Sequence, residues 1–231
     1  MDNMYFKNKN EFENFLQYLT IIGIGGESTC YRLNKRVIKY LNGPYAREFT
    51  IPEIEYYCRF NKYSSFIFSD GAIIINNQVK GLLMPYIKGT LLINYNFNEI
   101  ELPTLISKIK TTKDNILSIS QEGVELQDLA SVNIIVNNDL FFNFIDTNNY
   151  TLTEDINLPN KNIYYFNFTL FKEIFRRVDA SLDEVINLDK NFTIKDVYHH
   201  FDEFLISIYK QLLNTTETPK VKDVKKLIKR P

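Results

Sequence analysis

Short apolar runs separated by turn residues occupy the first part of the chain and predict a β-rich segment. The turns are Asn34-Lys35 and Asn76-Asn77-Gln78, residue types that favour tight connections. The runs predict five strands, at residues 20–23, 30–33, 36–41, 72–75 and 79–84. We therefore expect a small antiparallel sheet.

Apolar residues at helical spacing predict one helix before this sheet and one within it. The first covers residues 10–19, where Asn10 can cap the helix. The second begins at Thr50 and continues to about residue 63, because Pro52 and Glu53 follow a capping threonine as they do at many helix starts.

The balance shifts toward helix after residue 87. Helical spacing recurs in residues 102–120, 162–178 and 193–213, and Gly123 is expected to end the first of these helices. The chain thus predicts an α+β protein of two parts, residues 1–87 and 88–231, with the boundary near residues 86–89.

A predicted β-hairpin lies between the first two of these helices. Apolar runs at residues 134–136 and 140–145 flank the turn Asn137-Asn138-Asp139. Asp128 and Asn133 precede the first run, and Asp146 follows the second. Closing the hairpin is expected to bring these three side chains to one edge, where their oxygens suit a hard cation such as Mg²⁺.

Composition narrows the class of protein. The chain has 231 residues, 45% of them hydrophobic, and a net charge of -1, which argues against bulk attraction to nucleic acid or anionic membrane. Cys30 and Cys58 form no disulfide framework or metal-type pair, so a reducing, cytoplasmic setting is expected. No apolar run approaches the ~18 residues that span a bilayer. The basic residues 220–230 are expected to form a solvated terminal helix.

The order of these features resembles the protein-kinase-like superfamily over residues 21–150, as a small, atypical member of bacterial or viral type. The shared order is a glycine-rich turn between strands, a lysine late in a strand, a glutamate on the next helix, and Asp, Asn and Asp around a hairpin. The resemblance implies a two-lobed fold, with an antiparallel N-lobe sheet carrying one helix and a reduced, mainly helical C-lobe.

The resemblance also implies nucleotide-binding roles for the first part of the chain. Lys39 would contact the α- and β-phosphates of ATP, and Glu53 would pair with Lys39, with Glu55 as the alternative partner. Met84 would be the gatekeeper of an adenine hinge. The remaining implied ATP contacts are the phosphate-covering glycines and two backbone hinge positions, namely Gly23, Gly25, Gly26, Pro85 and Ile87.

Residues of the second part, 88–231, would perform the phosphoryl transfer. By the same resemblance, Asp128 would accept the proton of an acceptor hydroxyl, and Asn133 and Asp146 would bind Mg²⁺. The usual histidine and arginine before that aspartate are Leu126 and Gln127, and Thr147-Asn148 replaces Phe-Gly. No Ala-Pro-Glu segment follows, so regulation by activation-loop phosphorylation is not expected.

The sequence thus predicts an ATP- and Mg-dependent phosphotransferase, resembling a Ser/Thr protein kinase. The lack of large insertions favours a protein acceptor over a small molecule. Two alternatives stay open: a pseudokinase that acts as a binding module, and a small-molecule phosphotransferase or nucleotidyl transferase on the same fold.

Overall fold

The computed structural model describes residues 1–178 and 181–228, and the chain divides into two compact units. Unit 1 comprises residues 1–88 and 145–148, and unit 2 comprises residues 89–144 and 149–231. The predicted α+β class is confirmed. Residues 145–148 belong to unit 1, although the sequence placed them in the second part of the protein.

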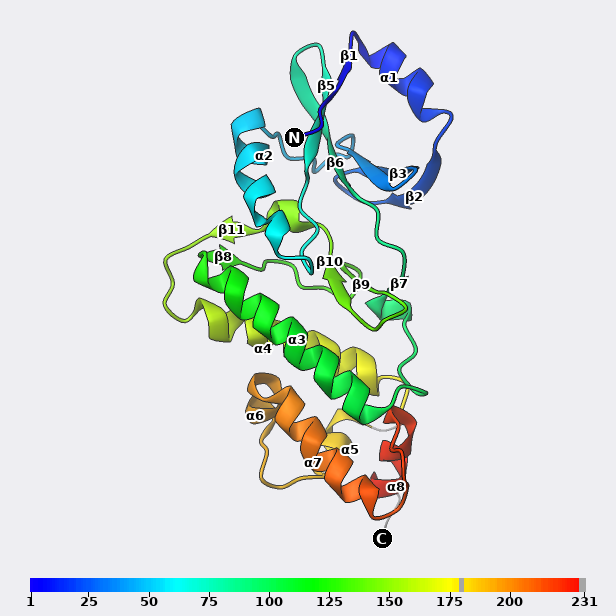
Figure 1. The fold of residues 1–231 in the computed structure, drawn as a ribbon, viewed down its shortest axis with the longest axis vertical. Helices are drawn as coiled ribbons and strands as arrows, with labels where there is room; N and C mark the ends of the chain where they lie inside the picture. Colours follow the sequence, from blue (N-terminus) through cyan, green and yellow to red (C-terminus); the bar gives the residue numbers. More distant parts are fainter. Residues whose placement is uncertain (179–180, 229–231) are drawn as a thin grey trace. The chain divides into compact units, whose positions relative to one another are not determined.

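Unit 1 is built on a six-stranded sheet in the order β1-β5-β6-β4-β3-β2 (Figure 1). The prediction of a wholly antiparallel sheet is wrong, because β1 pairs in parallel with β5. The remaining pairs are antiparallel. The strands are β1 (Met4–Phe6), β2 (Thr20–Ile24), β3 (Thr29–Leu33), β4 (Arg36–Tyr40), β5 (Gly71–Ile75) and β6 (Gln78–Pro85).

Asparagines make the tight turns of this sheet. Asn34 has a φ of 54°, and Asn76 and Asn77 have φ values of 49° and 61°. Asparagine tolerates this left-handed region better than most residues because its short polar side chain bonds locally. The predicted hairpins β3-β4 and β5-β6 are therefore confirmed.

Both faces of the unit 1 sheet are covered. Side chains of α1 (Lys9–Leu16) pack with Ile73 and Ile75 of β5, whereas α2 (Ile51–Cys58) packs with Ala72 and Ile74 of the same strand. Alternate residues of a strand point to opposite faces, so the two helices lie on opposite sides. A short 3-10 helix (Arg59–Lys62) follows α2 and accounts for the longer helix predicted from the sequence.

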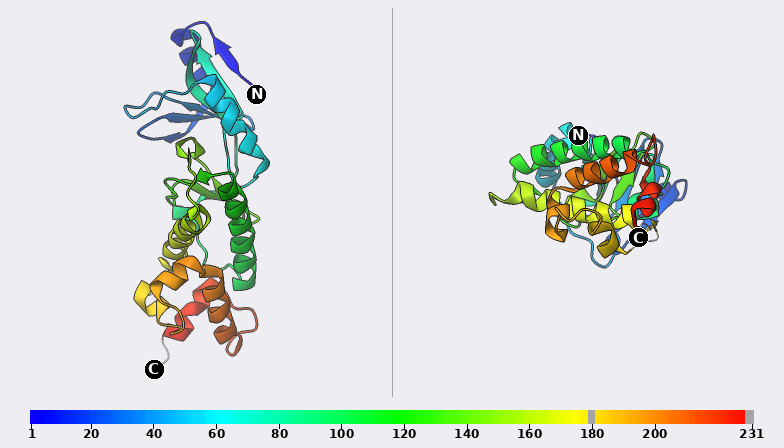
Figure 2. Two further views of the ribbon diagram at one scale, coloured as in Figure 1. Left: turned by 90° about the vertical axis from the view of Figure 1, so that its left-hand side faces the viewer. Right: turned by 90° about the horizontal axis from the view of Figure 1, so that it is seen from below.

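Unit 2 is mainly helical, and α3 packs against both α4 and α7 (Figures 1 and 2). The predicted end of α3 is confirmed, since Gly123 has a φ of +79° immediately after it. The predicted helix over residues 193–213 is two helices, because His200 leaves the helical region with a φ of -127°. The helices are α3 (Leu102–Gln121), α4 (Leu158–Phe175), α5 (Leu182–Ile186), α6 (Ile194–His199), α7 (Phe201–Leu213) and α8 (Lys225–Ile228).

Short strands complete unit 2. The predicted hairpin is confirmed, but its second strand starts later than expected, because Leu140 and Phe141 belong to the turn. Asn137 Oδ1 accepts hydrogen bonds from the Asp139 and Phe141 amides, which holds that turn. The strands are β7 (Thr90–Leu91), β8 (Val124–Glu125), β9 (Ile134–Val136), β10 (Phe142–Phe144) and β11 (Thr151–Leu152).

The basic C-terminal segment is only partly helical. A 3-10 helix (Val221–Val224) leads into α8, and Lys220 and Lys222 both pair with Glu99. The segment therefore packs on unit 2 and is not a separate solvated helix. Residues 229 and 230 of the predicted tail lie outside the described residues.

Candidate functional site

Lys39 is the centre of a charged cluster in unit 1. It lies in β4, opposite Cys30 of β3 and Leu82 of β6, and only 5% of it is exposed. Its Nζ pairs with Asp146 and donates to Asn148 Oδ1 at 2.8 Å. A buried ammonium is costly unless it is paired, so these partners from a distant part of the sequence explain how β4 holds it.

A second carboxylate lies near the same ammonium. Glu27 Oε2 is 3.7 Å from Lys39 Nζ. Two carboxylates, Glu27 and Asp146, thus surround one ammonium, and the cluster carries an excess of negative charge. An excess of negative charge beside an ammonium suits a divalent cation, whose own charge would offset that excess.

The segment that carries Asp146 is fixed within unit 1. Asp146 adopts a left-handed conformation with a φ of 62°. The next residue, Thr147, is 1% exposed, and its Oγ1 donates to the Ile67 carbonyl at 2.8 Å. The threonine therefore anchors the turn that aims Asp146 at Lys39.

Glu53 does not pair with Lys39 as predicted. Its carboxylate pairs with Arg47 and also accepts from the Thr50 amide, while the Thr50 hydroxyl accepts from the Glu53 amide. Glu53 is thus committed to the capping box of α2 and to an arginine in the preceding irregular segment. The expected lysine–glutamate pair is replaced by the pair of Lys39 with Asp146.

Arg47 links α2 to the Asp146 segment. Nη2 of its guanidinium pairs with Glu53, and Nη1 donates a hydrogen bond to the Asn148 carbonyl at 3.2 Å. Because the Asn148 side chain also accepts from Lys39, the connection from Glu53 to Lys39 runs through Arg47 and Asn148. Sequence reasoning missed Arg47, since nothing in residues 42–49 marks it apart from other surface arginines.

The glycine-rich loop follows β2 as predicted. The Gly25 amide donates to the Ser28 carbonyl at 2.9 Å, and the Tyr45 amide donates to the Gly26 carbonyl at 3.2 Å. A Cβ added to Gly23 or Gly25 would meet no atom closer than 3.9 Å, and neither residue has a positive φ. Local packing therefore gives no reason for glycine at these two positions, which leaves close approach by a ligand as a physical reason.

The predicted hinge residues end β6. Met84 is buried, and Ile87 packs against the same apolar cluster. The Tyr86 amide donates to the Lys35 carbonyl at 2.9 Å, whereas the Ile87 amide has no partner among the described residues. Pro85 lacks a donor but keeps its carbonyl. The backbone groups expected to meet adenine are thus present in unit 1.

In unit 2, the predicted site residues Asp128 and Asn133 are hydrogen-bonded to each other. Asn133 Nδ2 donates to Asp128 Oδ2 at 2.9 Å and to the Asp128 carbonyl at 3.1 Å. Asp128 is exposed and has a φ of 53°, a conformation uncommon for a residue with a side chain. The asparagine thereby orients the carboxylate and supports the unusual backbone beneath it.

Helix α4 positions the segment that carries Asp128. Fully buried Asn162 accepts from the Leu126 amide at 3.0 Å and donates to the Val124 carbonyl at 3.0 Å. Thr169 Oγ1 donates to the Leu129 carbonyl at 2.8 Å. Sequence reasoning missed Asn162, because it is the first residue of the helix predicted over residues 162–178, where asparagine is common as a cap.

Cys30 lies beside the charged cluster without joining it. Burial raises the pKa of the Cys30 thiol, although the neighbouring Lys39 ammonium acts in the opposite direction. A thiol with a raised pKa is mostly protonated near neutral pH and is a poor nucleophile. The residue is therefore a packing neighbour of Lys39, and covalent chemistry at this site is not expected.

The residues predicted to bind Mg²⁺ fit that ion only together with phosphate. Among the described residues, no three His, Cys, Asp or Glu side chains are grouped to hold a metal. Magnesium ordinarily takes one or two carboxylates and completes its shell with water and substrate phosphates. Asp146 offers a carboxylate in unit 1 and Asn133 an amide oxygen in unit 2, and neither side chain alone provides a complete set of magnesium ligands.

Comparisons with known proteins place the chain in no family. No protein-family model matches the sequence, and no curated protein is significantly similar to it. Within the ranges that the structure covers, no helix has both the length and the apolar character needed to cross a membrane.

Proposed function

We propose that this protein is an ATP- and Mg-dependent phosphotransferase of the protein-kinase-like superfamily. The observation that carries the proposal is the pairing of buried Lys39 with partly exposed Asp146, two residues 107 positions apart in the sequence. A lysine ammonium and a carboxylate held together in this way are the parts that phosphoryl transfer uses to bind nucleotide phosphates and their metal ion.

The residues of unit 1 supply nucleotide binding in this proposal. Lys39 binds phosphate oxygens, the backbone of Gly23 and Gly25 approaches the phosphates, and the Ile87 amide meets the base. Asp146 would hold Mg²⁺ together with the phosphates, whose charge the ion offsets when bound. Each of these contacts uses a group described above.

Asp128 supplies the acid–base step. The acceptor hydroxyl oxygen forms a bond to the γ-phosphorus, and the bond from that phosphorus to the β–γ bridging oxygen breaks. ADP leaves with the electron pair of the broken bond, and the hydroxyl proton passes to the Asp128 carboxylate. Asn133 keeps that carboxylate oriented by its hydrogen bond.

The Asp128→Asn variant tests this role. General-base catalysis contributes about 10²–10⁴-fold to rate, so transfer of the γ-phosphoryl group should fall by that factor while Mg-ATP binding is kept. Asp139→Asn, which alters an exposed carboxylate in the turn between β9 and β10 of the same unit, is the matched control and should leave transfer unchanged. Equal transfer by the Asp128 variant and the parent would refute the assignment.

A second candidate is a nucleotide-binding module without transfer. It is favoured by one observation, the pairing of Glu53 with Arg47 in place of Lys39. The two candidates separate on labelled ATP: a binding module is stabilised against heat by Mg-ATP but transfers no phosphate to any acceptor.

A further inference from the structure

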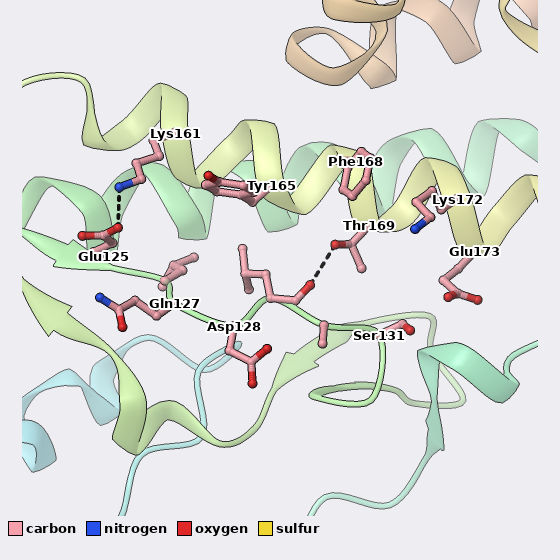
Figure 3. A pocket seen from close by; sticks show the side chains of 13 residues that line it. Glu125, Gln127, Asp128, Ser131, Lys161, Tyr165, Phe168, Thr169, Lys172 and Glu173 are labelled. Atoms are coloured by element: carbon pink, nitrogen blue, oxygen red, sulfur yellow. Dashed lines mark hydrogen bonds and ion pairs between the residues drawn. The ribbon is translucent and has the colours of Figure 1, made fainter. Parts of the chain in front are cut away.

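A pocket of about 560 Å³ lies within unit 2, between α4 and the segment of residues 125–131. Figure 3 shows α4 side chains along one side of this pocket and the segment along the other. The volume falls in the range of small-molecule sites, about 300–1,000 Å³. Asp128 lines the edge of the pocket and is exposed, and Figure 3 shows its carboxylate on the side of the segment that points away from α4.

One face of α4 lines the pocket, and the connection into this helix is short. Residues 153–157 connect β11 directly to α4, and no further segment is inserted there. Lys161, Tyr165, Phe168 and Lys172 follow one another at helical spacing and line the pocket together. A pocket of this size is thus present in unit 2 although the chain has no large insertion, the feature from which we expected a protein acceptor.

The charges around the pocket are mostly neutralised. Lys161 Nζ is 2.5 Å from Glu125, and Glu173 pairs with Arg176 at 3.0 Å. Lys172 is exposed and forms no ion pair with any residue that the structure describes. Its Nζ lies 5.0 Å from the centroid of the Phe168 ring.

The lining also offers an aromatic surface. Tyr165 is 45% exposed, which is high for a large aromatic side chain on a helix. Its position on α4 lies between Lys161 and Lys172, on the face that borders the segment in Figure 3. Aromatic rings with one exposed face pack well against planar bases or the C–H faces of sugars.

We propose that this pocket binds the phosphoryl acceptor, a small hydroxyl compound that carries a ring and one carboxylate or phosphate group. The anionic group pairs with Lys172, the ring lies on Tyr165, and the hydroxyl reaches Asp128 at the rim. This assignment rests on the proposed phosphotransferase function, because Asp128 takes the hydroxyl proton while ATP supplies the phosphoryl group and leaves as ADP.

The test measures transfer of labelled γ-phosphoryl from Mg-ATP to a panel of compounds with the full-length protein. The panel pairs anionic ring compounds with neutral partners: glucose 6-phosphate and glucuronate beside glucose, and adenosine monophosphate beside adenosine. Labelling should favour anionic members. Lys172→Gln should raise KM for a labelled anionic acceptor about tenfold or more, the loss of one charge-assisted contact, without changing KM for ATP.

A matched control and a binding measurement make the outcome decisive. Lys195→Gln alters an exposed lysine of α6 in the same unit and should leave both KM values unchanged. Binding of the same compounds is measured by ligand-observed NMR with the parent and the Lys172 variant.

Lysate proteins are offered as acceptors in a parallel reaction. Three results would overturn the inference: label that enters only these proteins, anionic and neutral compounds used equally, or ATP binding with no panel member bound or labelled. Absence of Mg-ATP binding itself would instead refute the proposed function.

Discussion

The partner of Glu53 distinguishes this site from the arrangement expected from the sequence, and double-mutant cycles can test it. One cycle combines Glu53→Gln with Arg47→Gln, and the other combines Glu53→Gln with Lys39→Gln. Glutamine keeps the side-chain oxygen that accepts from the Thr50 amide in the capping box of α2. The substitutions therefore remove charge while leaving the helix cap in place.

The exposed fractions of the paired side chains set the coupling energy expected from each cycle. The Arg47 and Glu53 side chains are 42% and 25% exposed, so their pair should be worth no more than other solvent-screened ion pairs, about 0.5–1 kcal/mol. Lys39 is paired with Asp146 and Glu27, so its cycle with Glu53 should give a coupling within the additivity error, about 0.3–0.5 kcal/mol.

Urea unfolding followed by far-ultraviolet circular dichroism measures both cycles. The chain contains no tryptophan, so dichroism is a more direct probe than fluorescence. The nucleotide-free protein is used for all variants. A larger coupling between Lys39 and Glu53 than between Arg47 and Glu53 would refute the assignment and restore the pair first predicted from the sequence.

Two further predictions concern positions whose surroundings differ sharply. Gly25→Ala should keep or raise the free energy of unfolding, by up to about 1 kcal/mol, yet weaken Mg-ATP binding about tenfold or more in calorimetry. Gly43→Ala should destabilise the protein, because its Cβ would lie 2.1 Å from the Gly26 carbonyl oxygen. A Gly43→Ala protein as stable as the parent would contradict this packing. Asn162→Ala should lower the free energy of unfolding by about 3 kcal/mol or more, because it removes several buried hydrogen bonds and strands a backbone amide. Exposed Asn160→Ala on the same helix is the control, and equal losses in the two variants would contradict the role of Asn162.

Local patterns in the sequence predicted much of the fold. Asn76 and Asn77 adopt the left-handed conformations that their turn requires, and Gly123 ends α3. The hairpin of β9 and β10 follows from two apolar runs around a polar turn. In each case the determining interactions lie within a few residues, so the sequence contains the information directly.

Long-range partners were harder to predict. The parallel pairing of β1 with β5 joins Met4 to Ile73, and no short-range signal specifies such a pair in a three-residue strand. The capping box at Thr50 and Glu53 was visible in the sequence, but Arg47 lies in an irregular segment whose course depends on the folded unit. Asn162 likewise acquires its role only when α4 meets the segment beside it.

Titration of Mg-ATP into the protein by calorimetry tests the central claim most directly. The account predicts saturable binding to the parent and a loss of about tenfold or more in affinity for Lys39→Gln, because a buried cation that meets phosphate is removed. Lys35→Gln alters an exposed lysine in the turn before β4 and should bind as the parent does. A parent protein that gives no binding heat with Mg-ATP, or a Lys39 variant that binds as tightly as the parent, would contradict the account.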